Sequence, residues 1–189
     1  MKIFSSLVFL TVAVLSCALI INASPTTRTA RIVTNKLELA IEQTIDVDEL
    51  VGNTNLYNMF DNAPLIGIQL AEVVCTLINL LLTLTNTDDN FSPTDSEEIF
   101  KRMLTLTTSQ NALMDRLSGR FGLLSSFSYS EPVRFSIVVL ATTVQQLAEN
   151  TIRLVPTRKQ ELEDAFVGVR EDYQKVMKNY SGYKRAGDL

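Results

Sequence analysis

The chain has 189 residues, with 17 basic and 21 acidic side chains, no histidine and a formal net charge of −4 at pH 7. The absence of histidine excludes Ser–His and Cys–His nucleophiles, a histidine metal site and an imidazole general base. The mildly acidic balance argues against nucleic acid, whose binding needs concentrated Lys and Arg. We therefore expect no enzyme, no metal site, no cofactor and no nucleic-acid partner.

The first 23 residues have the layout of a secretory signal peptide. Lys2 supplies a positive charge, an apolar run covers residues 3–21, and small residues precede the polar chain. Cleavage after Ala18 and cleavage after Ala23 both fit this layout. Removing 23 of the 189 residues leaves 166, which suffices for one domain and retains Cys75 as its only cysteine. We expect a secreted protein, extracellular or in the cell wall, without an intramolecular disulfide.

A polar segment over residues 24–34 comes next and contains a basic pair that ends at Arg31. It is expected to be a flexible lead-in or a propeptide that is cleaved after Arg31. Helical periodicity follows over residues 32–60. The acidic residues 46–49 and then Gly52 are expected to kink or divide this helix.

The most apolar part of the chain after the signal peptide covers residues 65–84 and carries one formal charge, Glu72. Residues 61–64 are expected to form a turn before it, with Pro64 in the first turn of the helix. Its length would allow a membrane span. Its polar residues recur every three or four positions, however, which favours a core helix or a cavity-lining helix inside a soluble bundle. These residues form one stripe, which we expect to be the part of the helix that meets water: Gln69, Glu72, Thr76, Asn79, Thr83 and Asn86.

A third helix is predicted from a clear start signal, with Ser92 as N-cap and Pro93 at the first helical position. Its apolar rhythm is interrupted by Gln110, and Gly119 is the expected C-cap. The loop predicted over residues 119–129 either folds back over the core or presents an adhesive apolar surface. Large apolar side chains stand in it among Gly and Ser: Phe121, Leu123, Leu124, Phe127 and Tyr129.

Two further helices complete the predicted fold. Ser130 and Pro132 mark the start of the fourth helix, Pro156 marks its end, and a fifth amphipathic helix reaches Tyr180. The fourth has apolar or small residues at heptad spacing, namely Val133, Ile137, Leu140, Val144, Leu147, Thr151 and Leu154. Because Pro or Gly separates short apolar seams, the sequence predicts one all-α antiparallel bundle of about five helices over residues 24–186.

Two kinds of processing signal accompany the helices. Asn90 and Asn179 begin N-glycosylation sequons, and Pro93 follows the first of them closely. Lys184 and Arg185 form a dibasic pair near the C-terminus, where trimming after Arg185 is possible.

The order of helix junctions resembles that of a known family. The matching features are Phe60-Asp61-Asn62 before the apolar helix, SPTDSEEIF at 92–100 before the next, the seam from Leu106 to Leu117, ATTVQQLA at 141–148, the Val155-Pro156 break and a last helix ending near Tyr180. Over most of the chain after the signal peptide, this pattern resembles the fungal hydrophobic-surface-binding protein and cell-wall mannoprotein family. The chain departs from it in having less Ala and Ser, and Gly-Arg-Phe-Gly at 119–122 where that family often has a lysine pair.

The resemblance implies a compact five-helix bundle, secreted or held in the cell wall. It also implies binding of hydrophobic surfaces, or of fatty-acid-like lipids in an apolar interior. No functional residue can be transferred from the family, because its ligand contacts have no recognisable signature in this sequence.

The excess of apolar helix faces favours a secreted, non-enzymatic protein that binds a hydrophobic small molecule or a hydrophobic surface. A lipid would occupy an incompletely packed core lined by Leu77, Leu81, Met103, Val144, Phe166 and Val169. A surface would be bound through the predicted loop, by Phe121, Phe127 and Tyr129. The alternative is a secreted structural or interaction module, or a host-directed effector, with a packed core and a protein partner. We do not expect an integral membrane protein.

Overall fold

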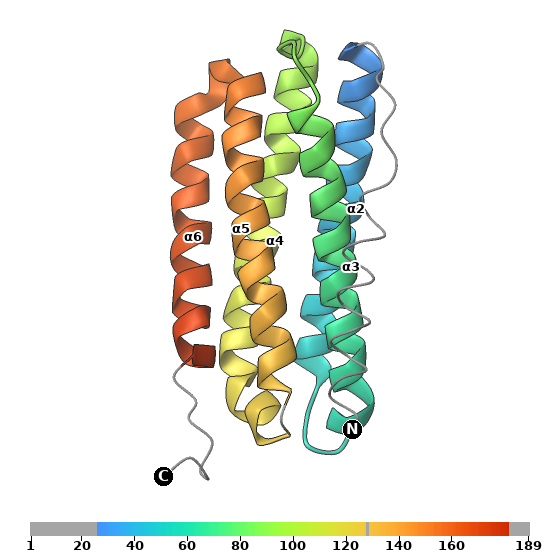
Figure 1. Cartoon of the computed structure of the whole chain (residues 1–189), viewed down its shortest axis with the longest axis vertical. Coiled ribbons are helices and arrows are strands. Elements are labelled where there is room, and N and C mark those ends of the chain that lie inside the picture. Colours follow the sequence, from blue (N-terminus) through green and yellow to red (C-terminus); the bar gives the residue numbers. More distant parts are fainter. Residues whose placement is uncertain (1–25, 128, 182–189) are drawn as a thin grey trace.

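The computed structural model describes residues 26–127 and 129–181. The predicted signal peptide, its cleavage sites and the Lys184-Arg185 pair lie outside these residues. The helices are α2 (Thr26–Asn53), α3 (Met59–Thr85), α4 (Pro93–Ser126), α5 (Ser130–Leu154) and α6 (Lys159–Ser181), with a short 3-10 helix at Pro156–Arg158 (Figure 1). The prediction of an all-α bundle of about five helices is confirmed for the part of the chain that is described.

The five helices form a closed ring around one core. Helix α2 packs against α3 and α4, α5 packs against α3 and α6, and α6 returns to α4. Each helix therefore has two main neighbours and turns one apolar face to the interior. Long antiparallel helices joined by short turns produce the upright bundle of Figure 1.

The start of α4 and the end of α5 follow the sequence signals closely. The Ser92 hydroxyl accepts a hydrogen bond from the Asp95 amide at 3.2 Å, and Pro93 is the first helical residue. Helix α5 ends at Leu154, directly before Val155 and the 3-10 turn that Pro156 opens. These boundaries fall where the local sequence signals placed them.

The first two helices differ from the prediction at three places. Helix α2 starts at Thr26, so residues 26–34 are helical and form no flexible lead-in. The acidic residues 46–49 do not divide it, because apolar side chains on both sides of them keep facing the core. Helix α3 begins at Met59 rather than after a turn at 61–64, and Pro64 lies inside it. The Asn58 carbonyl accepts the Asp61 and Asn62 amides, which closes the first turn ahead of the proline.

The predicted loop over residues 119–129 is also wrong over most of its length. Helix α4 continues through Gly119 to Ser126, and the turn to α5 is short. Packing explains the continuation, because Leu124 is fully buried and the Phe121 ring lies edge-on to Tyr180 of α6 at 4.7 Å. Tertiary contacts of this kind outweigh the cost of about 1 kcal/mol for a glycine inside a helix.

The polar stripe of α3 does not form a water-facing strip. Thr76 is buried, and Lys36 of α2 donates hydrogen bonds to the Asn79 carbonyl at 3.0 Å and the Thr83 hydroxyl at 2.8 Å. Partial burial lowers the pKa of Lys36. Leu65 and Ile68, in contrast, are about half exposed. Asn79 and Thr83 of the stripe therefore bind α2 through Lys36. The exposed surface of α3 includes the apolar side chains of Leu65 and Ile68.

Helix α3 is the one helix in the described ranges that is long and apolar enough to cross a membrane. That criterion uses length and composition only, and a core helix of a soluble protein meets it as well. The inner face of α3 is buried in the bundle, with Leu77, Leu80 and Leu84 inaccessible to solvent. This face of α3 therefore belongs to the core of the bundle.

Candidate functional site: the interior of the helix ring

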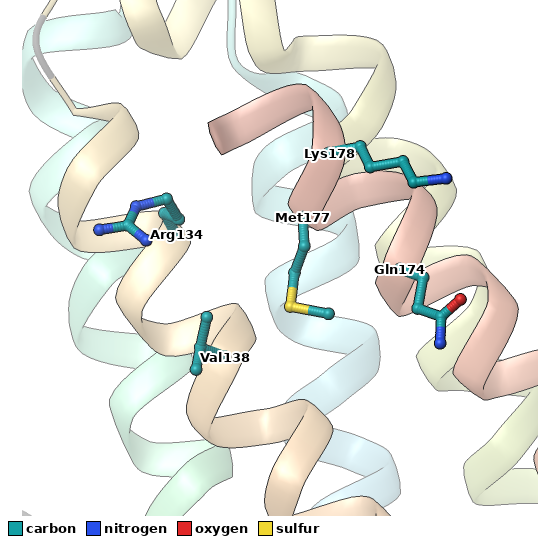
Figure 2. A pocket seen from close by; sticks show the side chains of 5 residues that line it. All are labelled: Arg134, Val138, Gln174, Met177 and Lys178. Carbon is teal, nitrogen blue, oxygen red and sulfur yellow. The ribbon is translucent and has the colours of Figure 1, made fainter. Parts of the chain in front are cut away.

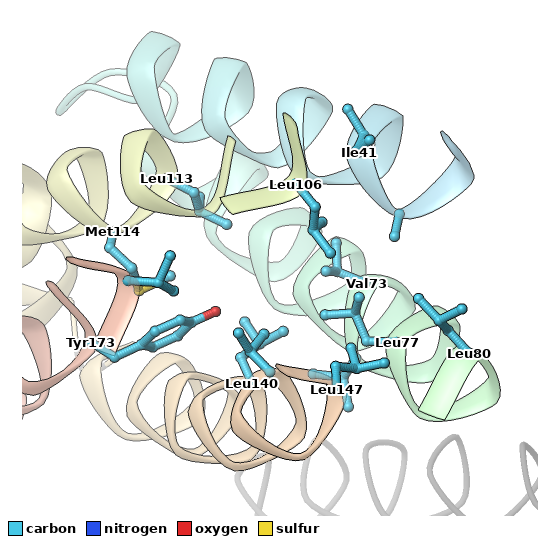
Figure 3. Packing of buried hydrophobic residues seen from close by; sticks show 14 of the residues in the cluster. Ile41, Val73, Leu77, Leu80, Leu106, Leu113, Met114, Leu140, Leu147 and Tyr173 are labelled. Atoms are coloured by element: carbon cyan, nitrogen blue, oxygen red, sulfur yellow. The ribbon is translucent and has the colours of Figure 1, made fainter. Parts of the chain in front are cut away.

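The interior of the ring is built from large aliphatic side chains. Figure 3 shows residues of α3, α4, α5 and α6 converging on one region, among them Leu77, Leu106, Leu113, Leu140, Leu147 and Tyr173. Helix α2 closes the ring and adds Val33 and Leu37, both fully buried. A ligand held here would meet hydrocarbon on nearly every side, which is the environment that suits an acyl chain.

The six residues predicted to line a ligand site come from four of the five helices. Leu77, Met103, Val144, Phe166 and Val169 all belong to the buried core, and Leu81 packs against it while partly exposed. The fold therefore brings all six to one core. Val33 and Leu37 lie on the predicted apolar face of α2, but they were not among the predicted lining residues.

A buried polar chain crosses this apolar interior. The Gln110 amide nitrogen donates to the Thr44 hydroxyl at 2.9 Å, and that hydroxyl donates to the Ala40 carbonyl at 2.7 Å. On the other side, the Tyr173 hydroxyl donates to the Gln110 side-chain oxygen. Burial raises the pKa of Tyr173, which therefore stays protonated. This chain ties α2, α4 and α6 together, and the break that Gln110 makes in the rhythm of α4 was its signal in the sequence.

Thr151 is a second polar side chain in the interior. Unlike Gln110, it has no hydrogen-bond partner among the described residues. It is fully buried on α5, one turn before the helix ends, and its hydroxyl makes no hydrogen bond within the described residues. The other buried polar atoms without a partner belong to side chains that are only half buried. An unpaired hydroxyl in an apolar core costs free energy, and a bound polar group can supply its missing partner.

A shallow groove lies outside the ring, between α5 and α6. It has a volume of about 350 Å³ and is lined by Arg134, Val138, Gln174, Met177 and Lys178. Figure 2 shows Arg134 and Val138 on α5 and Met177 pointing between the two helices, while the Lys178 side chain extends away from α5. The guanidinium of Arg134 is bound to Glu131 at 2.9 Å. Apolar side chains next to cationic ones suit an amphipathic anion, but none of the six predicted lining residues contributes to this groove.

The three residues predicted for surface adhesion are partly buried and pack against the core. Phe121 lies against Tyr180, as described above, and the Phe127 ring meets Phe60 edge-on at 5.0 Å. Tyr129 stands just before α5. Of the two predicted arrangements, the structure has the one in which these side chains fold back over the core.

The remaining candidate sites lie on the surface. Asn90 and Asn179 are both exposed, and the Asn179 amide donates to the Ser118 hydroxyl at 2.7 Å. Cys75 is half buried and forms no disulfide. Within the described ranges, no group of three or more acidic or cysteine side chains is arranged to hold a metal ion.

No protein-family model matches the sequence, and no curated protein matches it significantly. The solved structures that share the fold include two that contain fatty acids. The crystal structure of AfMP4p in complex with palmitic acid has a TM-score of 0.74 at 10% identity, covering 80% of this chain and 99% of that chain. Ligand binding domain 2 of the Penicillium marneffei MP1 protein, complexed with multiple arachidonic acids, has a TM-score of 0.66 at 13% identity, covering 86% and 100%. Both are all-helical fungal proteins that bind fatty acids, which is consistent with the family resemblance.

Proposed function

We propose that this chain is a non-enzymatic binding protein for a fatty acid or a similar single-chain lipid, held inside the helix ring. The observation that carries the proposal is the closed ring with an aliphatic interior contributed by all five helices. Two proteins of the same fold, solved with palmitic and arachidonic acids, support this ligand class. We also propose that the chain belongs to the fungal family that its helix junctions resemble.

The acyl chain would lie among the six predicted lining residues, between α3, α4, α5 and α6. The side chains there are packed, with Leu77 and Met103 inaccessible to solvent. Binding therefore requires leucine and methionine side chains to change rotamer, or helices of the ring to move apart. Methionine suits such a site because its unbranched side chain adapts to a changed shape.

The polar head of the ligand needs a partner in this apolar interior, and Thr151 supplies one. Its hydroxyl is buried and unpaired, so a hydrogen bond to a protonated carboxyl group satisfies both groups at once. A charged carboxylate would remain costly there, because burial disfavours the ionised form. The affinity for the fatty acid is therefore expected to rise as the pH falls toward the pKa of its carboxyl group.

Native mass spectrometry with palmitic acid as the probe tests the proposal. We expect a mass increment of at least one fatty acid, whereas a clean ligand-free mass after incubation would contradict it. Leu77→Ala removes a core side chain, costs about 2 to 5 kcal/mol of stability and leaves an apolar void, so it should bind palmitic acid more tightly. Leu117→Ala is the matched control, because Leu117 is equally inaccessible but was not predicted to line the site.

The groove between α5 and α6 is the rival location for the same ligand. Met177→Glu places a negative charge in the groove, at a partly buried side chain that also packs against the core, so its stability is measured alongside its uptake of palmitic acid. Uptake of palmitic acid that persists in this variant assigns the ligand to the interior. Uptake that is lost in Met177→Glu, while Leu77→Ala has no effect, assigns it to the groove.

We further propose that the protein is secreted, is extracellular or in the cell wall, and loses residues 1–23 as a signal peptide. The layout of those residues supports this proposal. N-terminal sequencing of the protein released by a eukaryotic secretory host distinguishes a start after Ala18 from one after Ala23. Retention of the whole chain inside the cell would contradict the proposal.

A further inference from the structure

Charge is distributed very unequally between the two ends of the bundle. One end carries the α2–α3 and α4–α5 turns and the C-terminal end of α6. The two turns, at residues 50–60 and 121–130, contain no Asp, Glu, Lys or Arg, and Glu49, Asp61, Arg120 and Glu131 border them. We call the end with these two turns the uncharged end. The contact between Phe60 and Phe127 joins these turns, and Figure 1 places them together. The other end carries the remaining turns, within residues 86–98 and 153–163. Its charged residues are Asp88, Asp89, Asp95, Glu97, Glu98, Arg153, Arg158, Lys159, Glu161 and Glu163.

The uncharged end also exposes large apolar side chains. Leu56 is 67% exposed, Tyr57 99% and Phe60 69%. All three come from the α2–α3 turn and the first turn of α3. A group of exposed large apolar side chains in a soluble protein marks an interaction site more often than scattered single residues do.

The turn that presents these side chains is held by neutral amides. The Asn58 side-chain oxygen accepts the Asn55 amide at 2.7 Å, and the Asn55 side-chain oxygen accepts the Tyr57 amide at 2.9 Å. The Asn58 amide group also donates to the Asn53 carbonyl at 3.0 Å. Because the backbone is fixed in this way, the exposed side chains are presented by an ordered turn.

We propose that this uncharged end docks onto a phospholipid bilayer of zwitterionic lipid, with Leu56, Tyr57 and Phe60 inserted at the interface. Aromatic rings are favoured at the level of the lipid head groups, where an apolar body and a polar tip are both accommodated. The fully exposed Tyr57 at a convex turn suits a soft bilayer better than a rigid protein groove. The docking surface lies outside the ring and does not require the proposed interior ligand.

Charge near this end selects zwitterionic over anionic lipid. Two cations near this end are neutralised, since Arg116 pairs with Asp48 at 2.8 Å and Arg134 with Glu131 at 2.9 Å. Arg120 donates to the Gly52 carbonyl at 2.8 Å and keeps its charge. The acidic side chains of Glu49 and Asp61 are exposed beside the turn. Negatively charged lipid would be repelled by these carboxylates, whereas a net-neutral surface is not. Apolar insertion should accordingly be insensitive to salt.

The chain contains no tryptophan, so the fluorescence of a single introduced tryptophan comes from the substituted position only. Tyr57→Trp, in the form that a eukaryotic secretory host releases, is mixed with phosphatidylcholine vesicles, with and without brominated phosphatidylcholine. We expect a blue-shifted emission that the brominated lipid quenches. Val167→Trp, at a half-exposed site on α6, is the control and should show neither change. Both variants carry the same N-terminal segment, so vesicle binding through that segment alone leaves the two reporters alike and overturns the proposal.

Flotation with phosphatidylcholine vesicles gives a second measurement. The triple variant Leu56→Ser/Tyr57→Ser/Phe60→Ser should lose at least about tenfold in vesicle partitioning, equivalent to about 1.4 kcal/mol. The matched control replaces three half-exposed aliphatic residues elsewhere, Leu39, Ile45 and Val167, by serine and should partition like the unaltered chain.

Three results would overturn the docking proposal. They are unchanged flotation of the triple variant, binding that requires anionic lipid such as phosphatidylserine, and an emission shift of Tyr57→Trp that grows with protein concentration in the absence of vesicles. The last of these would indicate contact between two copies of the chain. Palmitic acid uptake by the triple variant is measured in parallel, so failure of docking and failure of the interior site are distinguished.

Discussion

Substituting two buried threonines by valine tests how much a buried hydroxyl group contributes to the free energy of unfolding, with and without hydrogen-bond partners. Thr44 and Thr151 are both inaccessible to solvent, and valine has nearly the shape of threonine without the hydroxyl. The Thr44 hydroxyl makes two hydrogen bonds, to the Gln110 amide and the Ala40 carbonyl. The Thr151 hydroxyl makes none within the described chain. The same chemical change therefore acts on a satisfied group at one site and on an unsatisfied group at the other.

The two substitutions should change stability in opposite directions. Thr44→Val leaves the Gln110 amide nitrogen buried without that partner, which costs about 1 to 3 kcal/mol. Thr151→Val removes a hydroxyl whose burial is already uncompensated, and relief of that penalty should stabilise the protein by about 1 kcal/mol. The expected gap between the variants is thus about 2 to 4 kcal/mol, which exceeds the error of a denaturation experiment.

Urea unfolding followed by far-ultraviolet circular dichroism measures this gap. A shift of the transition midpoint at a constant slope reports a change in stability rather than in the surface exposed on unfolding. Equal destabilisation by both substitutions would refute the reasoning, because it would mean that the Thr151 hydroxyl has a partner such as a bound water. Repeating the titration with palmitic acid extends the test. If Thr151 holds the head group, Thr151→Val should gain less stability from the ligand than the unaltered chain.

Two further predictions concern pH. Hydrogen bonding by Arg158 lowers the pKa of Glu97, so this pair stabilises the fold above the unfolded pKa of about 4.3 and loses its effect as the pH falls. The stability difference between the unaltered chain and Glu97→Gln in urea titrations should accordingly vanish toward about pH 2. Burial raises the pKa of Tyr173 and Tyr180. Since only the unfolded chain releases these protons, stability should fall above about pH 10, and the tyrosinate absorbance of both residues should appear only with unfolding.

The sequence predicted the number of helices and the inward faces of α4, α5 and α6, because those depend on features that act locally. Ser92, Pro93 and Pro156 set boundaries through backbone chemistry, and the heptad spacing of α5 identified its buried face. Gly119 gave the opposite outcome. It is exposed, and a side chain at that position would touch nothing, so the glycine is only a weak helix former in a helix that packing maintains. Such an override depends on contacts with α6, which the sequence does not reveal.

The interior and the docking surface could be predicted only in part. Gln110 stood out as a polar interruption, but its partners Thr44 and Tyr173 are more than 60 positions away in the sequence. Leu56 and Tyr57 were hidden for a different reason. The break expected at Gly52-Asn53 is present, since α2 ends at Asn53. Periodicity did not show that the turn after it would expose the side chains of Leu56 and Tyr57.

Both ends of the bundle must hold their turns in place, and they do so by different means. At the charged end, Arg158 binds Glu97 at 2.7 Å and Glu161 at 2.8 Å, and Arg153 donates to the Leu84 carbonyl at 3.0 Å. At the uncharged end, asparagine side chains make most of the contacts to the backbone of the α2–α3 turn, and Arg120 adds a hydrogen bond to the Gly52 carbonyl at 2.8 Å. These contacts all have backbone groups as partners. The need to hold the turn explains why asparagines occur in it. It does not explain why Leu56 and Tyr57, which stand among them, are exposed. Their exposure is the feature of this end that folding does not require, and a bilayer interface is a surface that would use it.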